Sequence, residues 1–130
     1  MMTPRVEIEL DKLTHNARKL KAMYGSKGID LTFITKGGCG SHKIASALVS
    51  NGFRSFGDSH IANIQKMREG SVDAQFILIR SPAPSEVERV VEFADVSLNQ
   101  PIYAVSYALG YAMSSDNHSS GRRQLDFRFA

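Results

Sequence analysis

Apolar and polar positions change rhythm along the first part of the chain. Residues 5–10 alternate charged and apolar side chains, and this period of two predicts a short half-buried strand. Apolar residues then recur at helical spacing from Leu10 to Tyr24. We predict a helix there, with Asp11 as its N-cap and an end near Gly25 to Gly28.

From Ile29 onward, short apolar segments alternate with amphipathic ones. The apolar segments predict four strands, at residues 31–34, 53–56, 76–79 and 96–98. The segments between them predict three helices, whose expected N-caps are Ser41, Ser59 and Ser85. Each strand ends at a polar or glycine-rich position: Lys36, Gly57, Arg80 and Asn99. These endings are 21, 23 and 19 residues apart, which indicates a repeated strand–helix unit.

This repeat predicts an α/β fold with parallel strands and right-handed crossovers. Two architectures satisfy it. One is an open doubly wound sheet, and the other is a partial (β/α)8 TIM-type barrel made of about its first four β/α units. The pattern alone does not choose between them. In both, the residues that follow the strands gather at one edge of the sheet, so we look for chemistry there.

The end of the chain has a different composition. No lysine follows Lys66, no glutamate follows Glu92, and three of the four tyrosines lie between residues 103 and 111. We predict one α/β domain over residues 1–100. Residues 101–130 are expected to be a divergent tail, frame-shifted or disordered, without a further strand. Reading the coding DNA in its other frames past Asn99 tests the frameshift.

Composition excludes several classes of protein. The 130 residues fit one domain, and the net charge of +3 comes from scattered basic residues rather than a stripe that would bind nucleic acid. The first ten residues lack the apolar core of a signal peptide, and no apolar run is long enough to cross a membrane. A single cysteine, Cys39, cannot form an internal disulfide. We predict a soluble protein of the cytoplasm that binds neither nucleic acid nor membrane.

Lys36 is the strongest candidate for chemistry. It follows an apolar strand and precedes Gly37 and Gly38, so we expect a partly desolvated amine at the active-site edge of the sheet. Desolvation disfavours the ammonium form, and the neutral amine is the form that condenses with a carbonyl group. Lys36 is therefore a candidate Schiff-base lysine. An ordinary solvated lysine at the start of a loop remains the alternative.

Other polar residues carry weaker signals. Arg80 ends the third strand, where it either binds a carboxylate or phosphate or forms a surface ion pair. Cys39 is expected to be a small buried residue. His42 and His60 have no carboxylate partner at metal-ligand spacing, so we predict no metal site.

Three blocks of the sequence resemble the alanine racemase N-terminal domain superfamily. Residues 6–16 resemble the opening strand and helix of these enzymes, and Phe33-Ile34-Thr35-Lys36 is similar to the strand that delivers their cofactor lysine. The form of residues 35–40, together with residues 57–61 and 78–80, looks most like the alanine/ornithine racemase branch. The resemblance covers roughly residues 4–100, with the blocks in the right order. Its departures are His60, where the branch commonly has an arginine, and the pair Gly37-Gly38.

The resemblance implies a pyridoxal 5'-phosphate enzyme of fold type III, with a (β/α)8 barrel, a second mostly β domain and usually a homodimer. Lys36 would bind the cofactor as a Schiff base and act as a catalytic acid and base. Ile34 would pack beside the cofactor ring, and Ser59 and Arg80 would face the pocket. The implied reaction interconverts L- and D-amino acids.

The chain holds only four predicted strands, whereas a full barrel needs about 250 residues. The sequence therefore predicts an incomplete fragment of an amino-acid racemase. Two alternatives stay open: a non-catalytic protein of the same family that binds pyridoxal phosphate for cofactor homeostasis, and an inactive remnant. The opening strand predicted at residues 6–10 favours the racemase, because in the family it joins the β domain that the homeostasis proteins lack.

Overall fold

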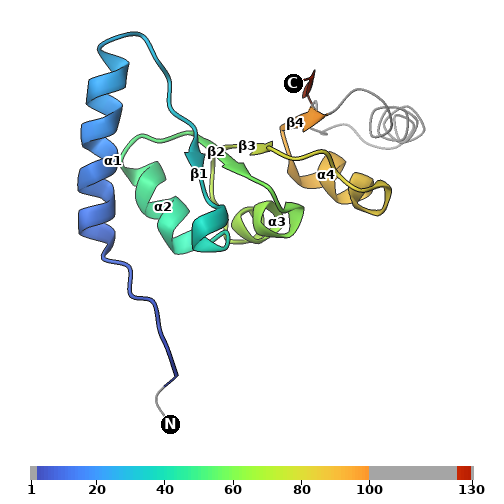
Figure 1. Cartoon of the computed structure of the whole chain (residues 1–130), viewed down its shortest axis with the longest axis horizontal. Helices are drawn as coiled ribbons and strands as arrows, with labels where there is room; N and C mark the ends of the chain where they lie inside the picture. Colours follow the sequence, from blue (N-terminus) through green and yellow to red (C-terminus); the bar gives the residue numbers. More distant parts are fainter. Residues whose placement is uncertain (1–2, 100–125, 130) are drawn as a thin grey trace.

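The fold is a parallel α/β sheet with helices on one side. We describe residues 3–99 and 126–129 of a computed structural model (Figure 1). The elements in chain order are α1 (Leu10–Gly25), β1 (Phe33–Ile34), the 3-10 helix η1 (Lys36–Gly38), α2 (His42–Ser50), β2 (Ser55–Asp58), α3 (Ile61–Glu69), β3 (Gln75–Leu78), the 3-10 helix η2 (Pro84–Glu86), α4 (Val87–Phe93), β4 (Val96–Asn99) and β5 (Asp126–Phe129). The predicted alternation of strands and helices is confirmed.

The strand order decides between the two predicted architectures. All strand pairs are parallel, and the order is β1-β2-β3-β4-β5, so each strand lies beside the next one in the chain. A doubly wound sheet reverses its order at one point and carries helices on both faces. Here α2, α3 and α4 lie on the same side of the strands (Figure 1). The partial (β/α)8 barrel is therefore the architecture.

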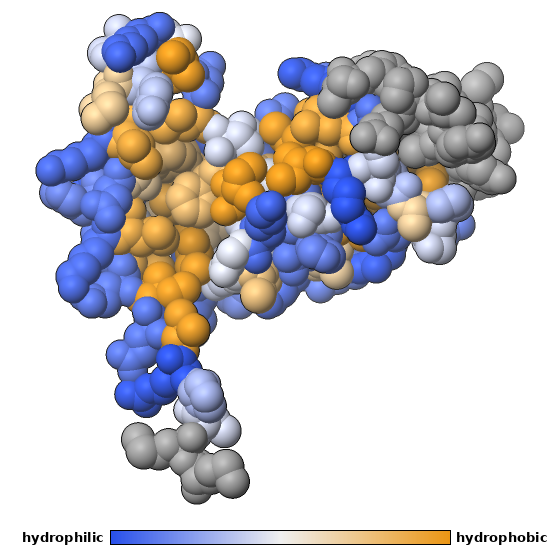
Figure 2. Space-filling view, viewed as in Figure 1, coloured by the Kyte–Doolittle hydropathy of each residue, from blue (hydrophilic) through white to orange (hydrophobic). Residues whose placement is uncertain are grey.

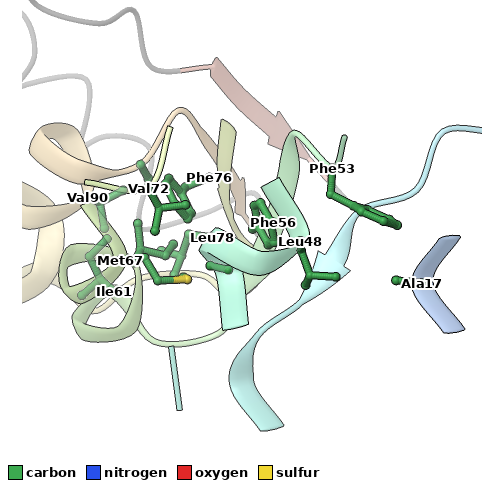
Figure 3. Packing of buried hydrophobic residues seen from close by; sticks show 13 residues of the cluster. Ala17, Leu48, Phe53, Phe56, Ile61, Met67, Val72, Phe76, Leu78 and Val90 are labelled. Carbon is green, nitrogen blue, oxygen red and sulfur yellow. The ribbon is translucent and has the colours of Figure 1, made fainter. Parts of the chain in front are cut away.

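The core lies between the sheet and these helices. Phe33, Phe56 and Phe76 occupy paired positions on adjacent strands, and their ring centroids are 6.4 Å and 6.0 Å apart along this row. Leu48 from α2 and Ile64 from α3 are fully buried against the same cluster (Figure 3). Strand residues that alternate toward the helices are thus buried, as the period-two pattern requires.

The opposite face of the sheet is less covered. Ile34 and Gly57 are paired on it, and Ile77 follows in register on β3. Ile34 is 42% exposed and Ile77 is half-buried. In a complete barrel this face points inward and is covered by the remaining strands. Figure 2 shows apolar side chains gathered beside α1 and over the strands.

The prediction for the amino-terminal segment is wrong. Residues 3–9 have no regular structure, and Val6 and Ile8 are exposed. The helix begins at Leu10 with Glu9 as its N-cap, not Asp11, and ends at Gly25 as predicted. An alternating segment becomes a strand only when a neighbouring strand accepts its hydrogen bonds, and the described residues provide none there.

The prediction that residues 101–130 contain no further strand is wrong for residues 126–129. Asp126–Phe129 form β5, which pairs in parallel with β4 from Val96 to Asn99. This strand is defined by its parallel pairing with β4, a long-range contact that the local sequence does not reveal. The remaining residues of the predicted tail, 101–125 and 130, lie outside the described residues.

Two of the three predicted helix caps are also wrong. Ser41 caps α2, since its side chain accepts a hydrogen bond from the Ile44 amide. The N-cap of α3 is His60 rather than Ser59, and the His60 amide donates a hydrogen bond to the Asp58 side chain. Before α4 the N-cap is Glu86 rather than Ser85, which lies exposed within η2. The Glu86 carboxylate accepts a hydrogen bond from the amide of Ala83, the N-cap residue of η2. Within the described ranges, no helix is long and apolar enough to cross a membrane.

Candidate functional site

The carboxyl ends of the parallel strands bring four polar residues to one edge of the sheet. Lys36 follows β1, Asp58 and Asn99 are the last residues of β2 and β4, and Arg80 follows β3. In barrels of this kind the active site is built at this edge, on the loops after the strands. The sequence predicted Lys36 and Arg80 as site residues and placed Asp58 and Asn99 at strand ends, without a role at the site for Asp58.

Lys36 is the first residue of η1, directly after β1 and Thr35. Its side chain is exposed and has no hydrogen bond or ion pair within the described part of the chain. The prediction that the Lys36 amine is partly desolvated is therefore wrong in the described structure. The reason is the uncovered sheet face described above, because Lys36 follows Ile34 by two positions and β1 is an edge strand. Its amine is therefore accessible from solvent.

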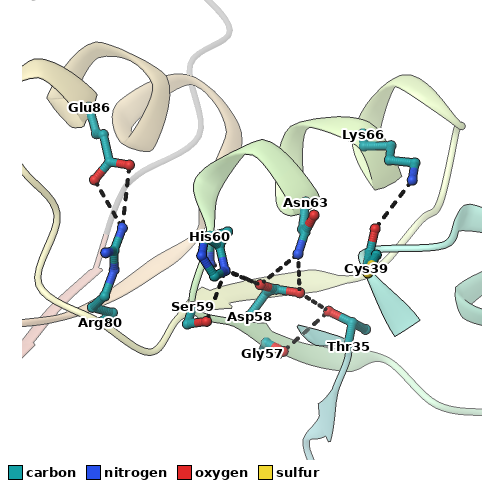
Figure 4. Close-up of polar contacts among 10 residues, drawn as sticks. All are labelled: Thr35, Cys39, Gly57, Asp58, Ser59, His60, Asn63, Lys66, Arg80 and Glu86. Atoms are coloured by element: carbon teal, nitrogen blue, oxygen red, sulfur yellow. Dashed lines mark hydrogen bonds and ion pairs between the residues drawn. The ribbon is translucent and has the colours of Figure 1, made fainter. Parts of the chain in front are cut away.

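Asp58 is the buried centre of a polar cluster (Figure 4). Its side chain is 0% exposed, and it accepts hydrogen bonds from Thr35 Oγ1 at 2.7 Å, from the His60 amide at 2.9 Å and from Asn63 Nδ2 at 3.1 Å. These donors offset the loss of water around the carboxylate. The cluster thus links the ends of β1 and β2 with the first turn of α3.

Ser59 and His60 lie beside this cluster at the carboxyl end of β2. Ser59 Oγ is 3.1 Å from His60 Nδ1, and the imidazole is 3.9 Å from Asp58 Oδ1. Ser59 is half-buried and His60 is exposed. The hydroxyl of Ser59 therefore lies at the carboxyl edge of the sheet, where a ligand would bind. Its predicted role in facing the cofactor pocket stays a proposal.

Arg80 makes an ion pair with Glu86, at 3.3 Å between Nη2 and Oε2 (Figure 4). Half of the Arg80 side chain is exposed, so the pair contributes little to stability. Of the two interpretations of Arg80, the described structure matches the surface ion pair. A role in binding an anion stays a proposal.

Ile34 and Cys39 lie on either side of the lysine. Ile34 is on the uncovered face, where its Cδ1 atom is 2.9 Å from the position a Cβ atom would take at Gly57. A side chain at Gly57 would therefore displace Ile34. Cys39 is exposed and has a left-handed backbone with φ 51°. The prediction that Cys39 is a small buried residue is wrong.

Described residues form two hollows beside the sheet, and Ile34 lines the smaller one. A groove of about 350 Å³ lies between α1 and β1 and is lined by apolar residues that include Leu13, Leu20 and Phe33. A wider one of about 770 Å³ lies at the amino ends of the strands, beside Arg54 and Gln75. Neither includes Lys36, and among the described residues no three His, Cys, Asp or Glu side chains group as metal ligands.

A sequential parallel sheet, with helices on one face and polar residues at the carboxyl edge, defines part of a β/α barrel. The family described as "Alanine racemase, N-terminal domain" matches residues 8–108. This match covers most of the chain, and the chain belongs to that family. The resemblance stated from the sequence is confirmed.

Three curated proteins are similar to this chain. Lysine racemase of Thermotoga maritima is 33% identical over 102 residues, and ornithine racemase of Acetoanaerobium sticklandii is 33% identical over 101 residues. Alanine racemase 1 of Caldanaerobacter subterraneus subsp. tengcongensis is 28% identical over 107 residues. These alignments cover 78%, 78% and 80% of this chain and 29%, 28% and 26% of the relatives. The chain therefore spans less than a third of the length of each.

Proposed function

We propose that these residues form the lysine-bearing part of a pyridoxal-phosphate-dependent amino-acid racemase. The observation that carries the proposal is the place of Lys36. It follows the first strand of a parallel barrel sheet, at the catalytic edge, inside the segment that matches the racemase family. Its primary amine is exposed and has no ion pair with the described residues, so an aldehyde can reach it.

The residues at this edge fit such a cofactor. Lys36 would hold it covalently, Ile34 offers apolar surface beside the lysine, and Ser59 and Arg80 offer a hydroxyl and a guanidinium for its polar groups. When bound, pyridoxal phosphate supplies an electron sink for the charge left when a proton leaves the substrate Cα. The Lys36 amine would move that proton as an acid and base.

The three similar proteins are racemases, and their names give lysine, ornithine and alanine as substrates. They support an amino-acid substrate and favour the racemase over a cofactor-homeostasis protein. The opening strand no longer supports this choice, because residues 3–9 are irregular. We further propose the cytoplasm as the compartment and a homodimer as the full-length assembly, both by analogy with the family.

Reductive trapping tests the role of Lys36. The purified chain is incubated with pyridoxal phosphate and reduced with borohydride, and modification of its seven lysines is mapped by mass spectrometry. We expect Lys36 to be modified more than Lys43, an exposed lysine on α2 that serves as the internal control. Equal modification of Lys36 and Lys43 would refute the proposal. Incubation with L-lysine, L-ornithine and L-alanine, followed by chiral chromatography, tests for racemisation.

A further inference from the structure

Every polar atom of Thr35, the residue before Lys36, forms a hydrogen bond. Its amide donates to Gly57 O at 2.9 Å, and its carbonyl accepts from the amides of Gly38 at 2.9 Å and Gly40 at 3.3 Å. Its hydroxyl donates to Asp58 Oδ2 at 2.7 Å. Thr35 is 4% exposed, so water does not compete for these hydrogen bonds. The backbone that leads into Lys36 is fixed at this point.

Asp58 is fixed in turn by donors from α3. Its carboxylate accepts from the His60 amide and from Asn63 Nδ2, and it is fully buried. A buried carboxylate is costly unless it is well hydrogen-bonded. Accepting a hydrogen bond from the His60 amide alone would be served by a neutral serine or asparagine at this position. The charged group also reaches across to β1, where it holds the threonine that precedes Lys36.

The loop after Lys36 is held by the same helix. Gly40 is buried with φ +63°, and a Cβ atom there would lie 2.6 Å from Asn63 Cβ. Lys66 Nζ donates to Cys39 O at 3.2 Å (Figure 4). Residues 35–40 are therefore attached at both ends to β2 and α3, and the side chain of Lys36 extends from the middle of a fixed loop.

We propose that Asp58 is a positioning residue that acts through Thr35 to fix the direction in which Lys36 leaves β1. This inference rests on the proposed function of Lys36. A catalytic or covalent group must be held close to its productive geometry by neighbouring hydrogen bonds and packing. Asp58 is fully buried on the adjacent strand and provides this support through its hydrogen bond to Thr35.

Two pairs of variants separate positioning from stability. Thr35→Val keeps the shape of the side chain and removes the hydroxyl, whereas Thr35→Ser retains the hydroxyl. Asp58→Asn replaces one carboxylate oxygen with an NH2 group. That group is a donor, so it cannot accept the hydrogen bonds that Thr35, His60 and Asn63 donate to Asp58. Asp95→Asn is its matched control, because Asp95 also accepts from a strand amide, Phe76 N at 2.7 Å, and from Arg68 on α3.

The first measurement needs no cofactor. Hydrogen exchange at the Gly38 and Gly40 amides, followed by NMR, reports whether Thr35 holds the loop. The Gly70 amide, bonded to Lys66 O, is the internal reference. We expect Thr35→Val and Asp58→Asn to accelerate exchange at Gly38 and Gly40 by about tenfold relative to Gly70, the effect of losing a hydrogen bond to a charged group. Thr35→Ser and Asp95→Asn should not change this ratio.

The second measurement is the ratio of reductive trapping at Lys36 to that at Lys43. A displacement of about 1 Å costs on the order of a hundredfold in rate, so we expect this ratio to fall by about tenfold or more in Thr35→Val and Asp58→Asn. It should stay at the wild-type value in Thr35→Ser and Asp95→Asn.

The outcomes distinguish the two proposals. Unchanged loop exchange in Thr35→Val overturns the positioning role, whatever the trapping shows. An unchanged trapping ratio in Thr35→Val, with selective wild-type trapping, overturns it as well and leaves the function of Lys36 standing. A wild-type ratio of one refutes the proposed function instead, and with it the positioning of a reactive amine.

Discussion

At the scale of single residues, the site depends on backbone conformations as much as on side chains. Lys36 could be predicted from the sequence, because a lysine after an apolar strand and before glycines is a recognisable pattern. Asp58 could not, because an aspartate at the end of a strand is ordinary. Its importance comes from Thr35, which is 23 residues away and reaches it only in the folded chain.

Gly40 gives a direct test of this local geometry. Its left-handed φ of +63° and its approach to Asn63 exclude a Cβ atom. We expect Gly40→Ala to lower the free energy of unfolding by about 2–5 kcal/mol, since the left-handed backbone costs about 1–2 kcal/mol and the overpacking about 1–3 kcal/mol. Gly37→Ala is the matched control, because nothing lies within 4 Å of its Cβ position. Urea unfolding of both variants measures the difference, and equal stabilities would contradict the packing of Gly40 on α3.

At the scale of elements, periodicity predicted the strands and helices that pack on one another. β1 to β4 and α1 to α4 all appear close to their expected positions. Errors occurred where a partner elsewhere in the chain decides the structure. Residues 3–9 alternate but pair with no strand among the described residues, while β5 is defined by its pairing with β4. Local sequence does not encode such partners.

The helix caps offer a test at this scale. Ser41 accepts a hydrogen bond from the Ile44 amide, whereas Ser85 is exposed and the Glu86 side chain caps η2. We expect Ser41→Ala to destabilise the protein by about 1 kcal/mol, the usual value of an N-cap. Ser85→Ala should change stability by less than about 0.5 kcal/mol. Thermal or urea unfolding measures both, and a larger loss in Ser85→Ala would refute the assignment.

At the scale of the whole molecule, the described sheet has two open edges. β1 pairs only with β2, and β5 pairs only with β4. Apolar residues such as Leu20 and Ile34, 48% and 42% exposed, lie beside the uncovered surface. Open strand edges and exposed apolar area promote association between chains. Such edges are expected in the described sheet, because five strands cannot close a barrel of eight.

Self-association is therefore the expected behaviour of the 130-residue chain. We expect its apparent mass in analytical ultracentrifugation to increase with protein concentration. A substitution of Ile34 by Lys, which charges the uncovered face, should reduce the effect. The opposite finding, a single monomeric species for the wild-type chain across the concentration range, would show that this surface is protected.

Weak cofactor binding is a second expectation at this scale. In barrels of this kind, the loops after strands seven and eight bind the phosphate group, and the described residues hold five strands. We expect an absorbance titration with pyridoxal phosphate to show no stoichiometric band at micromolar concentration. A tight band that is absent in Lys36→Ala would contradict this expectation while supporting the role of the lysine.

The sequential order of the strands has a consequence for how the chain acquires its structure. Paired residues are close along the polypeptide: Phe33 with Phe56, and Phe56 with Phe76. Each new strand–helix unit can dock on the one made just before it as the polypeptide leaves the ribosome. The lysine loop and the carboxylate that holds it belong to two consecutive units, which begin with β1 and β2. The contact between them can therefore form before the later strands are synthesised.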